Sequence, residues 1–571
     1  MATSPAPSHP AQRWLANALG LGLVLLVAFR LGATLLQVTK RVQFPYDLMY
    51  WPDDYYLSCV LRLDLGLSPY GNPADANSWI YAPGAPALGW LLLKPLGLAR
   101  SYFAHKLLGQ LWFWLAVAVA TGLGRALCRG ASRPLDRPLP LDGPLPVEEL
   151  ALAGPPPLGG PQTLLLVGVL ALAAYMNPVA DSLHPTNLEL IAMSLAAWFA
   201  ARFEALPASR RLLGCLLLPA VALCFKQTGA VAISASLALC ALITPGISTL
   251  ERLRLLAASA LGPLLVFGVM WLSWGSNFVA WVWEIPASAG FQAFKTRDLV
   301  AGSALWLYPV LALLLVQLVR AYRTRREIRS RGFLRASLPA LMYTPLAIIA
   351  LFKTLGGPNN LTLLLFLYTS LGAPALISLT LRDSSAQRSY SPALASALLI
   401  ALCVVSWTPR KRAPVAADYA YGARLCEYVA QRQACGERVY LGRGMTCFLK
   451  AGSMPLDRVM AAEDVSQSKY PLGYAERLKS ADYDVVIAIQ RDLFSPWLKQ
   501  AQWPAILDQY SIFGRLDAGP HGDVWTEGFS DLMGPAGFYE RKRERGKHSL
   551  NSAGRCDFVG AEPYQQGTPN P

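Results

Sequence analysis

The pattern of apolar and polar positions divides most of the chain into long apolar runs joined by short polar connections. A helix that crosses a membrane needs about 17–25 mostly apolar residues. Runs that reach or approach this length predict about eleven membrane-spanning helices. They are Trp14–Val38, Phe103–Leu123, Thr163–Met176, Leu188–Ala201, Leu212–Cys224, Thr228–Ile243, Leu255–Trp274, Leu305–Leu318, Leu338–Phe352, Leu361–Leu379 and Ser391–Trp407.

The run Tyr81–Leu98 is apolar as well, but Pro83, Pro86 and Pro95 interrupt it. Proline removes a backbone donor and breaks a helix interior. We therefore expect interfacial or re-entrant helices in this run and no crossing.

Arginine clusters test this topology. With the N-terminus in the cytoplasm, every cluster falls on the cytoplasmic side, as the positive-inside rule requires. A crossing at Tyr81–Leu98 would instead place the seven arginines of the fourth cluster outside. The eleven-helix topology leaves the residues after about Pro409 outside the cytoplasm. The clustered segments are Arg125–Arg137, Arg202–Arg211, Glu251–Arg254, Arg320–Arg335 and Arg382–Arg388.

Composition agrees with a membrane protein. The 571 residues are 54% hydrophobic, and 15% are charged against about 25% in soluble domains. These values exclude the disordered, fibrous and small disulfide-rich classes. The net charge of +15 is confined to the short connections and is not joined to aromatic residues on one surface, so we expect no nucleic-acid partner.

The predicted fold class is therefore an α-helical polytopic membrane protein with a small α/β domain outside the cytoplasm. Residues 1–408 would form the transmembrane domain and residues 409–571 the C-terminal domain. In the latter, Arg438–Leu441 and Asp484–Ile489 are typical of strands and Tyr474–Lys479 of a helix. Its four cysteines, Cys426, Cys435, Cys447 and Cys556, allow two disulfides in three pairings.

Polar residues gather on the predicted outer side, in the connections that follow the first, third and fifth helices and in two later ones. A transport path would need such groups through the membrane depth, so this distribution favours a site at the lipid–water boundary. The residues are Asp47, Asp53, Asp54, Asp64, Tyr70, Tyr81, Asn177, Asp181, His184, Asn187, Glu189, Lys226, Gln227, Glu284, Lys295, Arg297, Asp298, Lys353, Asn359 and Asn360.

The segment Trp51–Tyr70 predicts a surface helix that begins at Pro52, with Asp53 and Asp54 beside its positive end. Gly66 can end the helix, and a turn containing Tyr70 follows. A purely structural interpretation is that the two acids only cap this helix.

This segment resembles the first outer loop of glycosyltransferases of the GT-C superfamily, including polyprenyl-phosphate-sugar-dependent enzymes similar to protein mannosyltransferases. The shared features are an acid after the first span, a short helix, a glycine about thirteen residues on and a Pro-Tyr pair. His184–Glu189, Phe225–Gly229 and Gly356–Asn360 resemble later loops of that family. The likeness covers roughly Trp14–Trp407. Relatives often carry Asp-Glu where this chain has Asp53-Asp54, so the catalytic acid stays open between Asp53, Asp54 and Asp47, with the spacing to Gly66 favouring Asp53.

The resemblance implies an inverting transfer of a sugar from a polyprenyl-phosphate carrier to a glycan, lipid or protein acceptor outside the cytoplasm. An acid of the first loop would act as general base. It further implies donor-phosphate binding by Lys226, Gln227, Lys353 or Arg30, and sugar or acceptor binding by His184, Glu189, Tyr70, Tyr81 and Asn360. The expected location is a bacterial inner membrane.

Structural alternatives accompany these assignments. A lysine at a membrane boundary commonly snorkels to the interface. Arg30 must face the bundle or a water-filled cleft, where it could contact donor phosphate or an acid such as Asp47. His184 is an ordinary loop residue in most such positions. No cofactor is required; if a divalent metal such as Mg²⁺ or Mn²⁺ is used, its donors would be Asp53, Asp54, Asp181, His184 and Glu189.

Two other classes of function compete with the glycosyltransferase interpretation. A transporter or lipid flippase would carry charges at mid-membrane depth and two related halves, and neither is visible in the sequence. A non-catalytic scaffold would tolerate neutralisation of the first-loop acids. A polysaccharide polymerase or ligase would differ from the favoured class only in its acceptor.

Overall fold

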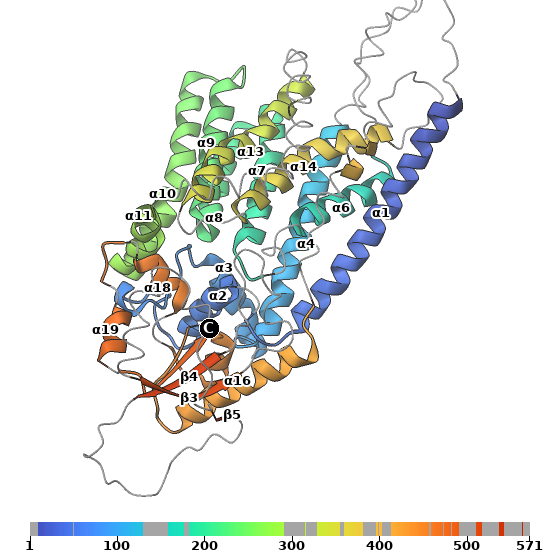
Figure 1. The fold of residues 1–571 in the computed structure, drawn as a ribbon. Coiled ribbons are helices and arrows are strands. Elements are labelled where there is room, and N and C mark those ends of the chain that lie inside the picture. Colours follow the sequence, from blue (N-terminus) through green and yellow to red (C-terminus); the bar gives the residue numbers. More distant parts are fainter. Residues whose placement is uncertain are drawn as a thin grey trace, which may run out of the picture.

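The computed structural model is mostly helical, with a small sheet near its C-terminus (Figure 1). It describes residues 10–48, 51–129, 158–175, 182–290, 315, 328–353, 359–380, 396–397, 399–401, 413–442, 444–455, 458–466, 468–471, 473–480, 482–489, 510–516, 536–541 and 562–563.

Long apolar helices form the larger part of the molecule. Their sequences are apolar on most sides, as expected where both lipid and neighbouring helices are apolar. α10 packs on α8, α4 on α7, and α13 on α7 and α9. Glycine permits close approach: a Cβ at Gly262 of α10 would lie 2.0 Å from the carbonyl oxygen of Leu216 in α8. These helices are α1 (Pro10–Gln43), α4 (Tyr102–Arg129), α6 (Gly160–Tyr175), α7 (Thr186–Arg202), α8 (Ala208–Phe225), α9 (Gln227–Ile243), α10 (Thr249–Val279), α13 (Ile328–Phe352) and α14 (Asn359–Thr380).

Five described helical stretches are long and apolar enough to cross a membrane: Asn17–Gln43, Tyr102–Cys128, Ala208–Phe225, Thr249–Ser288 and Arg331–Phe352. Three shorter apolar helices accompany them, Gly160–Tyr175, Gln227–Ile243 and Leu363–Pro374. The chain is thus a multi-pass membrane protein with five candidate spans among its described residues, and the expected count of about eleven is not reached there. Nine of the eleven expected runs coincide with a described helix. The other two, Leu305–Leu318 and Ser391–Trp407, lie largely outside the described residues.

Two breaks shape the helical part at one end. Lys226 has extended backbone angles (φ −157°, ψ 130°), which separate α8 from α9. Gly275 has φ +67°, a conformation that glycine adopts without steric cost, and it kinks α10. A short π-helix (Ala280–Glu284) and α11 (Ile285–Ser288) follow the kink.

The first connection folds into α2 (Trp51–Asp64), a 3-10 turn (Pro73–Asp75), α3 (Gly84–Leu93) and a second 3-10 turn (Lys94–Leu96). The helix predicted to begin at Pro52 and to end near Gly66 is confirmed, and Gly66 has φ +72°. At about 1.5 Å per residue, α3 is about 15 Å long and too short to cross a membrane. Its neighbouring leucines, Leu91, Leu92, Leu96 and Leu98, are exposed, as expected of an interfacial segment.

The C-terminal residues form helices and a five-stranded sheet of order β1-β2-β4-β3-β5. β1 and β2 are parallel, with Val439 opposite Val485, and the other pairs are antiparallel. The predicted strands at Arg438–Leu441 and Asp484–Ile489 and the helix at Tyr474–Lys479 are confirmed to within a residue or so. The elements are α16 (Ala416–Ala434), β1 (Val439–Leu441), α17 (Met445–Ala451), α18 (Val459–Ser466), α19 (Gly473–Lys479), β2 (Val485–Ile489), β3 (Tyr510–Leu516), β4 (Ala536–Arg541) and β5 (Glu562–Pro563).

A disulfide joins Cys426 of α16 to Cys447 of α17. Cys435 is disulfide-bonded as well, and Cys556 lies outside the described residues. The five cysteines described as free thiols are buried or half-buried, consistent with packing roles.

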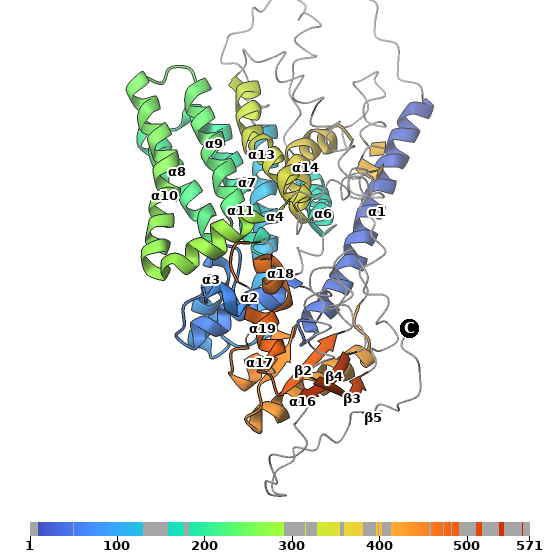
Figure 2. The same ribbon diagram turned by 60° about the vertical axis from the view of Figure 1, so that its left-hand side comes forward.

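The C-terminal elements lie at the same end of the helical part as α2 and α3 (Figures 1 and 2). Buried apolar residues form two clusters. One lies among the long helices, and the other joins residues 44–85 to residues 421–487. The first connection and the C-terminal residues therefore share a hydrophobic core. The predicted boundary at residues 408/409 falls in a stretch outside the described residues.

Candidate active site

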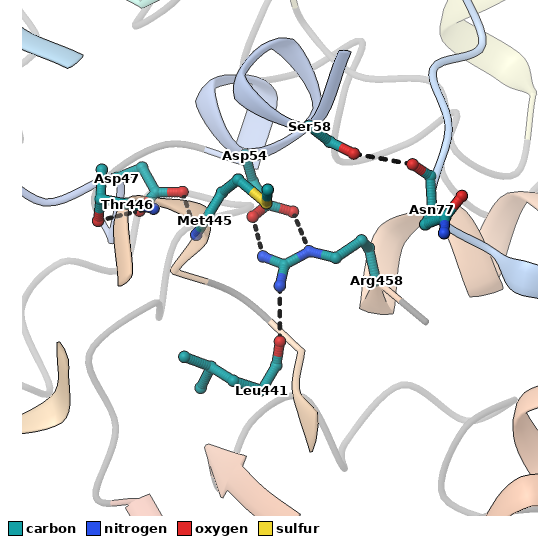
Figure 3. Close-up of polar contacts among 8 residues, drawn as sticks. All are labelled: Asp47, Asp54, Ser58, Asn77, Leu441, Met445, Thr446 and Arg458. Atoms are coloured by element: carbon teal, nitrogen blue, oxygen red, sulfur yellow. Dashed lines mark hydrogen bonds and ion pairs between the residues drawn. The ribbon is translucent and has the colours of Figure 1, made fainter. Parts of the chain in front are cut away.

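The three acids of the first connection have separate partners. Asp47 accepts hydrogen bonds from the backbone N–H groups of Met445 (2.7 Å) and Thr446 (3.0 Å) and from the Thr446 hydroxyl (2.7 Å). These groups belong to the first turn of α17, so Asp47 caps that helix from a distant part of the chain. The side chain is buried and its oxygens are engaged in structure (Figure 3).

Asp54 forms a buried ion pair with Arg458, which stands just before α18. The Arg458 Nε donates to one carboxylate oxygen at 3.0 Å and its Nη2 contacts the other. The Nη1 of Arg458 donates to the carbonyl oxygen of Leu441 at 2.7 Å. Asp54 therefore faces the C-terminal segment, which comprises the elements from α16 to β5, as Figure 3 shows.

Asp53 has different partners, in α4 and in the loop before α7. Its carboxylate accepts a hydrogen bond from the backbone N–H of Leu183 at 2.7 Å and another from the hydroxyl of Tyr102. The Nζ of Lys106 lies 4.0 Å away, with both side chains buried. Lys106 also donates to the carbonyl oxygen of Arg41 at 2.9 Å. Of the three acids, Asp53 is thus the one whose partners come from the helical part.

Burial raises the pKa of Asp53 to about 6, because a carboxylate loses its hydration inside the protein. The Lys106 ammonium, the Leu183 amide and the Tyr102 hydroxyl stabilise the charged form and limit this rise. A carboxylate with this pKa is charged at neutral pH and yet more basic than an ordinary aspartate. Such a group is suited to general base catalysis near pH 7.

A small pocket lies at the loop residue Leu183, whose backbone N–H donates to Asp53; Asp53 itself is fully buried and is not among the lining residues. The pocket lining includes Tyr56, His105, Leu183, His184 and Asn187. Leu183 belongs to both sites: its backbone N–H donates to Asp53, and the residue also lines the pocket. The pocket is thus lined by hydroxyl, imidazole and amide groups, and one of its lining residues, Leu183, is hydrogen-bonded to the buried carboxylate of Asp53.

Lys226 and Glu189 form a second buried polar centre where α8 and α9 meet α7. Lys226 Nζ lies 3.2 Å from Glu189 Oε2, and the Thr228 hydroxyl donates to Glu189 Oε1 at 3.1 Å. The side chains of Lys226 and Glu189 are 3% and 0% exposed. The expected phosphate-binding lysine and the expected sugar-binding acid therefore neutralise each other in this structure.

Tyr81 and His184 connect the two centres. The Tyr81 hydroxyl lies 3.4 Å from His184 Nε2, and Lys226 Nζ lies 5.6 Å from the centre of the Tyr81 ring. The backbone N–H of Thr186 donates to His184 Nδ1 at 3.2 Å, which leaves Nε2 to carry the ring proton. Burial, with the Lys226 charge, holds the pKa of His184 well below its usual range, so the imidazole is neutral.

The remaining predicted residues have structural partners or lie elsewhere. Gln227 donates to the carbonyl oxygens of Ile80 (3.3 Å) and Val282 (2.9 Å), and Tyr70 donates to that of Tyr81 at 2.8 Å. Lys353 donates to the carbonyl oxygen of Pro286 at 2.6 Å.

Arg30 and Asn360 are not brought to the Asp53 centre. Arg30 is buried within α1, thirteen residues before that helix ends, which corresponds to about 20 Å along its axis. The hydrogen bonds described for Asp47 come from Met445 and Thr446. Asn360 lies in the first turn of α14.

The sequence analysis missed several residues around these centres: Tyr102, His105 and Lys106 of α4, and Arg458 and Asp464 of the C-terminal segment. A signal for the first group was present, because a histidine and a lysine in the first turn of an apolar helix lie on the same side as the polar loops. Asp464 accepts a hydrogen bond from Tyr55 at 3.1 Å. No local pattern indicates that Asp464 and Arg458 reach the first connection.

Two of the residues expected as metal donors are engaged in ion pairs, and a third has no described position. Asp54 is held by Arg458, Glu189 by Lys226, and Asp181 lies outside the described residues. Among the described residues, no group of three or more histidine, cysteine, aspartate or glutamate side chains is arranged to hold a metal ion.

Comparisons with known proteins give a fold likeness only. No family model matches the chain, and no characterised protein matches its sequence. It is similar to the Archaeoglobus fulgidus oligosaccharyltransferase tethered with an acceptor peptide containing the NVT sequon, with 12% identity and a TM-score of 0.45 over 88% of this chain and 73% of that chain. It is also similar to AglB of that organism in complex with an inhibitory peptide and a dolichol-phosphate, with 11% identity and a TM-score of 0.43 over 94% and 76%.

A third structure, of the oligosaccharyltransferase in complex with Zn and sulfate, gives 11% identity and a TM-score of 0.39 over 86% of this chain and 72% of that chain. Likeness at these scores does not define a function for this chain.

Proposed function

We propose that the chain is an inverting glycosyltransferase that moves a sugar from a polyprenyl-phosphate carrier to an acceptor hydroxyl or amide at the membrane surface. Asp53 is the proposed general base. The observation that carries this assignment is that the three acids have different partners. Asp47 and Asp54 are engaged by the C-terminal segment. Asp53 is instead held by Tyr102 and by the amide of Leu183, a residue that lines the pocket, and its pKa is raised to about 6.

The proposed reaction makes one bond and breaks one. The acceptor oxygen or nitrogen attacks the anomeric carbon from the face opposite the phosphate, and its proton passes to the Asp53 carboxylate. The bond between the anomeric carbon and the phosphate oxygen breaks, and its electron pair leaves with the carrier phosphate. A positioned general base contributes about 10²–10⁴-fold to such a step.

The leaving phosphate requires a cation nearby. Lys226 is the proposed partner. Its present pairing with Glu189 supports an exchange in which the carrier phosphate replaces the Glu189 carboxylate beside the lysine. The neutral His184 lines the pocket and contacts the Tyr81 hydroxyl, and Lys226 lies over the Tyr81 ring. His184 and Tyr81 are proposed to contact the sugar.

We further propose that the N-terminus is cytoplasmic and that the C-terminal segment lies outside, in a bacterial inner membrane. Arginine–glutamate pairs support this orientation. Arg211 pairs with Glu251 and Arg335 with Glu204. They belong to the beginnings of α8 and α10, the first half of α13 and the turn after α7, and these helix ends lie remote from α2 in Figure 1. A membrane-impermeant maleimide applied to intact cells should label Leu67→Cys and should not label Ser209→Cys. The opposite labelling would overturn the orientation.

The function is tested by incubating the purified chain in lipid nanodiscs with a panel of polyprenyl-phosphate sugars and candidate acceptors. We expect transfer with at least one donor, or slow donor hydrolysis where the acceptor is missing. Asp53→Asn, which lacks the proposed base, is the negative control for transfer and hydrolysis. The proposal fails if no donor of the panel is bound or consumed, or if Asp53→Asn consumes it at the unaltered rate.

A further inference from the structure

The contacts between the first connection and the C-terminal segment converge on α2, the helix that carries Asp53. Arg458 lies at their centre and is fully buried (Figure 3). Its guanidinium contacts both carboxylate oxygens of Asp54, and its Nη1 donates to the carbonyl oxygen of Leu441. Its backbone N–H donates to the carbonyl oxygen of Ala76 at 2.7 Å. One residue thus ties α2, β1 and the loop after α2 together.

The planar fork of arginine is needed for this arrangement. A lysine offers one rotatable ammonium group and cannot bind two carboxylate oxygens and a carbonyl in one plane. A buried ion pair is weak evidence for net stability, but removal of one partner strands the other charge without water. The Asp54–Arg458 pair therefore specifies how the C-terminal segment sits on α2.

Asp53 and Asp54 are neighbours on α2, and successive helical residues point about 100° apart. The same helix is consequently held on two sides. Arg458 holds it through Asp54, while Tyr102 and the Leu183 amide hold it through Asp53.

We propose that Arg458 is a positioning residue: it fixes the rotation and height of α2 through Asp54 and so sets Asp53 against Tyr102, Lys106 and Leu183. The catalytic part of this inference, that Asp53 is the base, rests on the proposed function. The structural part, that Arg458 positions α2, does not. Asp47 adds a second attachment by capping α17. The C-terminal segment is thereby a component of the site.

The first measurement needs no activity. Hydrogen exchange of the full chain in nanodiscs is followed for peptides from α2 and, as an internal reference, from α8 and α9. Arg458→Met should lower the protection of α2 amides by about 100-fold, as expected for loss of one partner of a buried pair. The reference helices should be unchanged. Unaltered protection of α2 would overturn the proposal.

The matched control is Arg432→Met. Arg432 is also buried, lies in the same segment and forms a two-oxygen ion pair, but with Glu437 five residues away (3.2 and 3.0 Å). It should leave α2 protected. If it loosens α2 as much as Arg458→Met does, the effect is general to the segment and the specific role of Arg458 is refuted.

The second measurement uses sugar transfer. Arg458→Lys, which keeps the charge and loses the fork, should lower kcat about tenfold with KM little changed and should shift the acidic limb of the pH–rate profile, which reports Asp53. Arg458→Lys also replaces Arg458→Met in the exchange measurement if the methionine variant fails to fold. A fall in folded yield with an unshifted pH profile would show a merely structural residue. If the wild-type chain transfers no sugar, the proposed function fails, whereas the exchange result still decides whether Arg458 positions α2.

Discussion

Lys226 and Glu189 form an ion pair of 3.2 Å at the point where α8 ends and α9 begins. Both side chains are almost completely shielded from solvent, and the Thr228 hydroxyl donates to the same carboxylate. Because the backbone of Lys226 is extended, its side chain leaves the helical repeat and turns towards α7. The break between the two helices therefore serves to deliver a cation to a buried acid.

Removal of either partner of this pair should destabilise the protein strongly. We expect Lys226→Met or Glu189→Gln to lower the free energy of unfolding by about 3–5 kcal/mol, because each leaves a buried charge or acceptor uncompensated. Thermal unfolding in nanodiscs measures this loss. Arg211→Met is the control, since the Arg211–Glu251 pair is partly exposed and should contribute less than about 1 kcal/mol. Equal losses at both sites would contradict the prediction.

The same pair should respond to added volume at Gly229. A Cβ there would lie 2.9 Å from Glu189 Oε1 and 3.0 Å from its Cγ, closer than such atoms approach. Gly229→Ala should displace Glu189 and destabilise the protein by about 1–3 kcal/mol. At Gly268 of α10 a Cβ meets no atom within 4 Å, so Gly268→Ala should be neutral or slightly stabilising. Paired thermal unfolding of the two variants distinguishes the cases.

Asp53→Asn should abolish sugar transfer and leave the fold intact. The amide keeps the shape and can still accept from Leu183, but it cannot take a proton, so we expect a loss of about 10²–10⁴-fold. The control is Asp64→Asn on the same helix, because Asp64 pairs with the exposed Arg100 and should retain activity. Retained activity in Asp53→Asn would move the base to Asp54 or Asp47.

The pH dependence of transfer should report the environment of Asp53. A base whose pKa is raised to about 6 loses its function as the pH falls through 6, whereas an ordinary aspartate would retain it to about pH 4. Lys106→Met removes the cation that favours the charged form, so the midpoint should move to higher pH. Rates measured between pH 5 and pH 8 on folded protein provide the check. A midpoint that stays in place would show that Lys106 does not act on this carboxylate.

The Cys426–Cys447 disulfide should stabilise the attachment of α17. It links α16 to the helix that Asp47 caps, across 21 residues. A loop of this size corresponds to about 3 kcal/mol. Cys426→Ser with Cys447→Ser should lower the melting temperature and increase proteolysis after residue 440. Identical melting of the double variant and the wild type would contradict the prediction.

Much of the helical part follows from the sequence because each long helix is apolar over most of its own length. The helix at Trp51–Asp64 was also predictable, since Pro52, the two acids and Gly66 mark its ends locally. Its expected position along the surface was wrong, because residues 52–62 are buried. The shared core of residues 44–85 and 421–487 was not. It arises from packing between segments that are remote in sequence, and neither segment has a pattern that names the other.

The candidate site shows the same limit. The sequence brought forward Asp47, Asp53 and Asp54 together, because all three are acids in one polar connection. Their different partners, Met445, Leu183 and Arg458, separate their roles, and these partners lie 398, 130 and 404 residues away. Lys106 was overlooked because a cation in the first turn of an apolar helix is usually an interfacial anchor.

The separation of 404 residues between Asp54 and Arg458 has a consequence for biosynthesis. Ribosomes add roughly 5–20 residues per second, so α2 emerges about 20–80 s before the arginine that completes its surroundings. During that interval a nascent chain carries an aspartate pair at the membrane surface with no counterion from the distal end. The surroundings of α2 would thus be complete only after residue 458 has been synthesised, and under the proposed function a product that terminates before it would be inert towards the cell's stock of activated carriers.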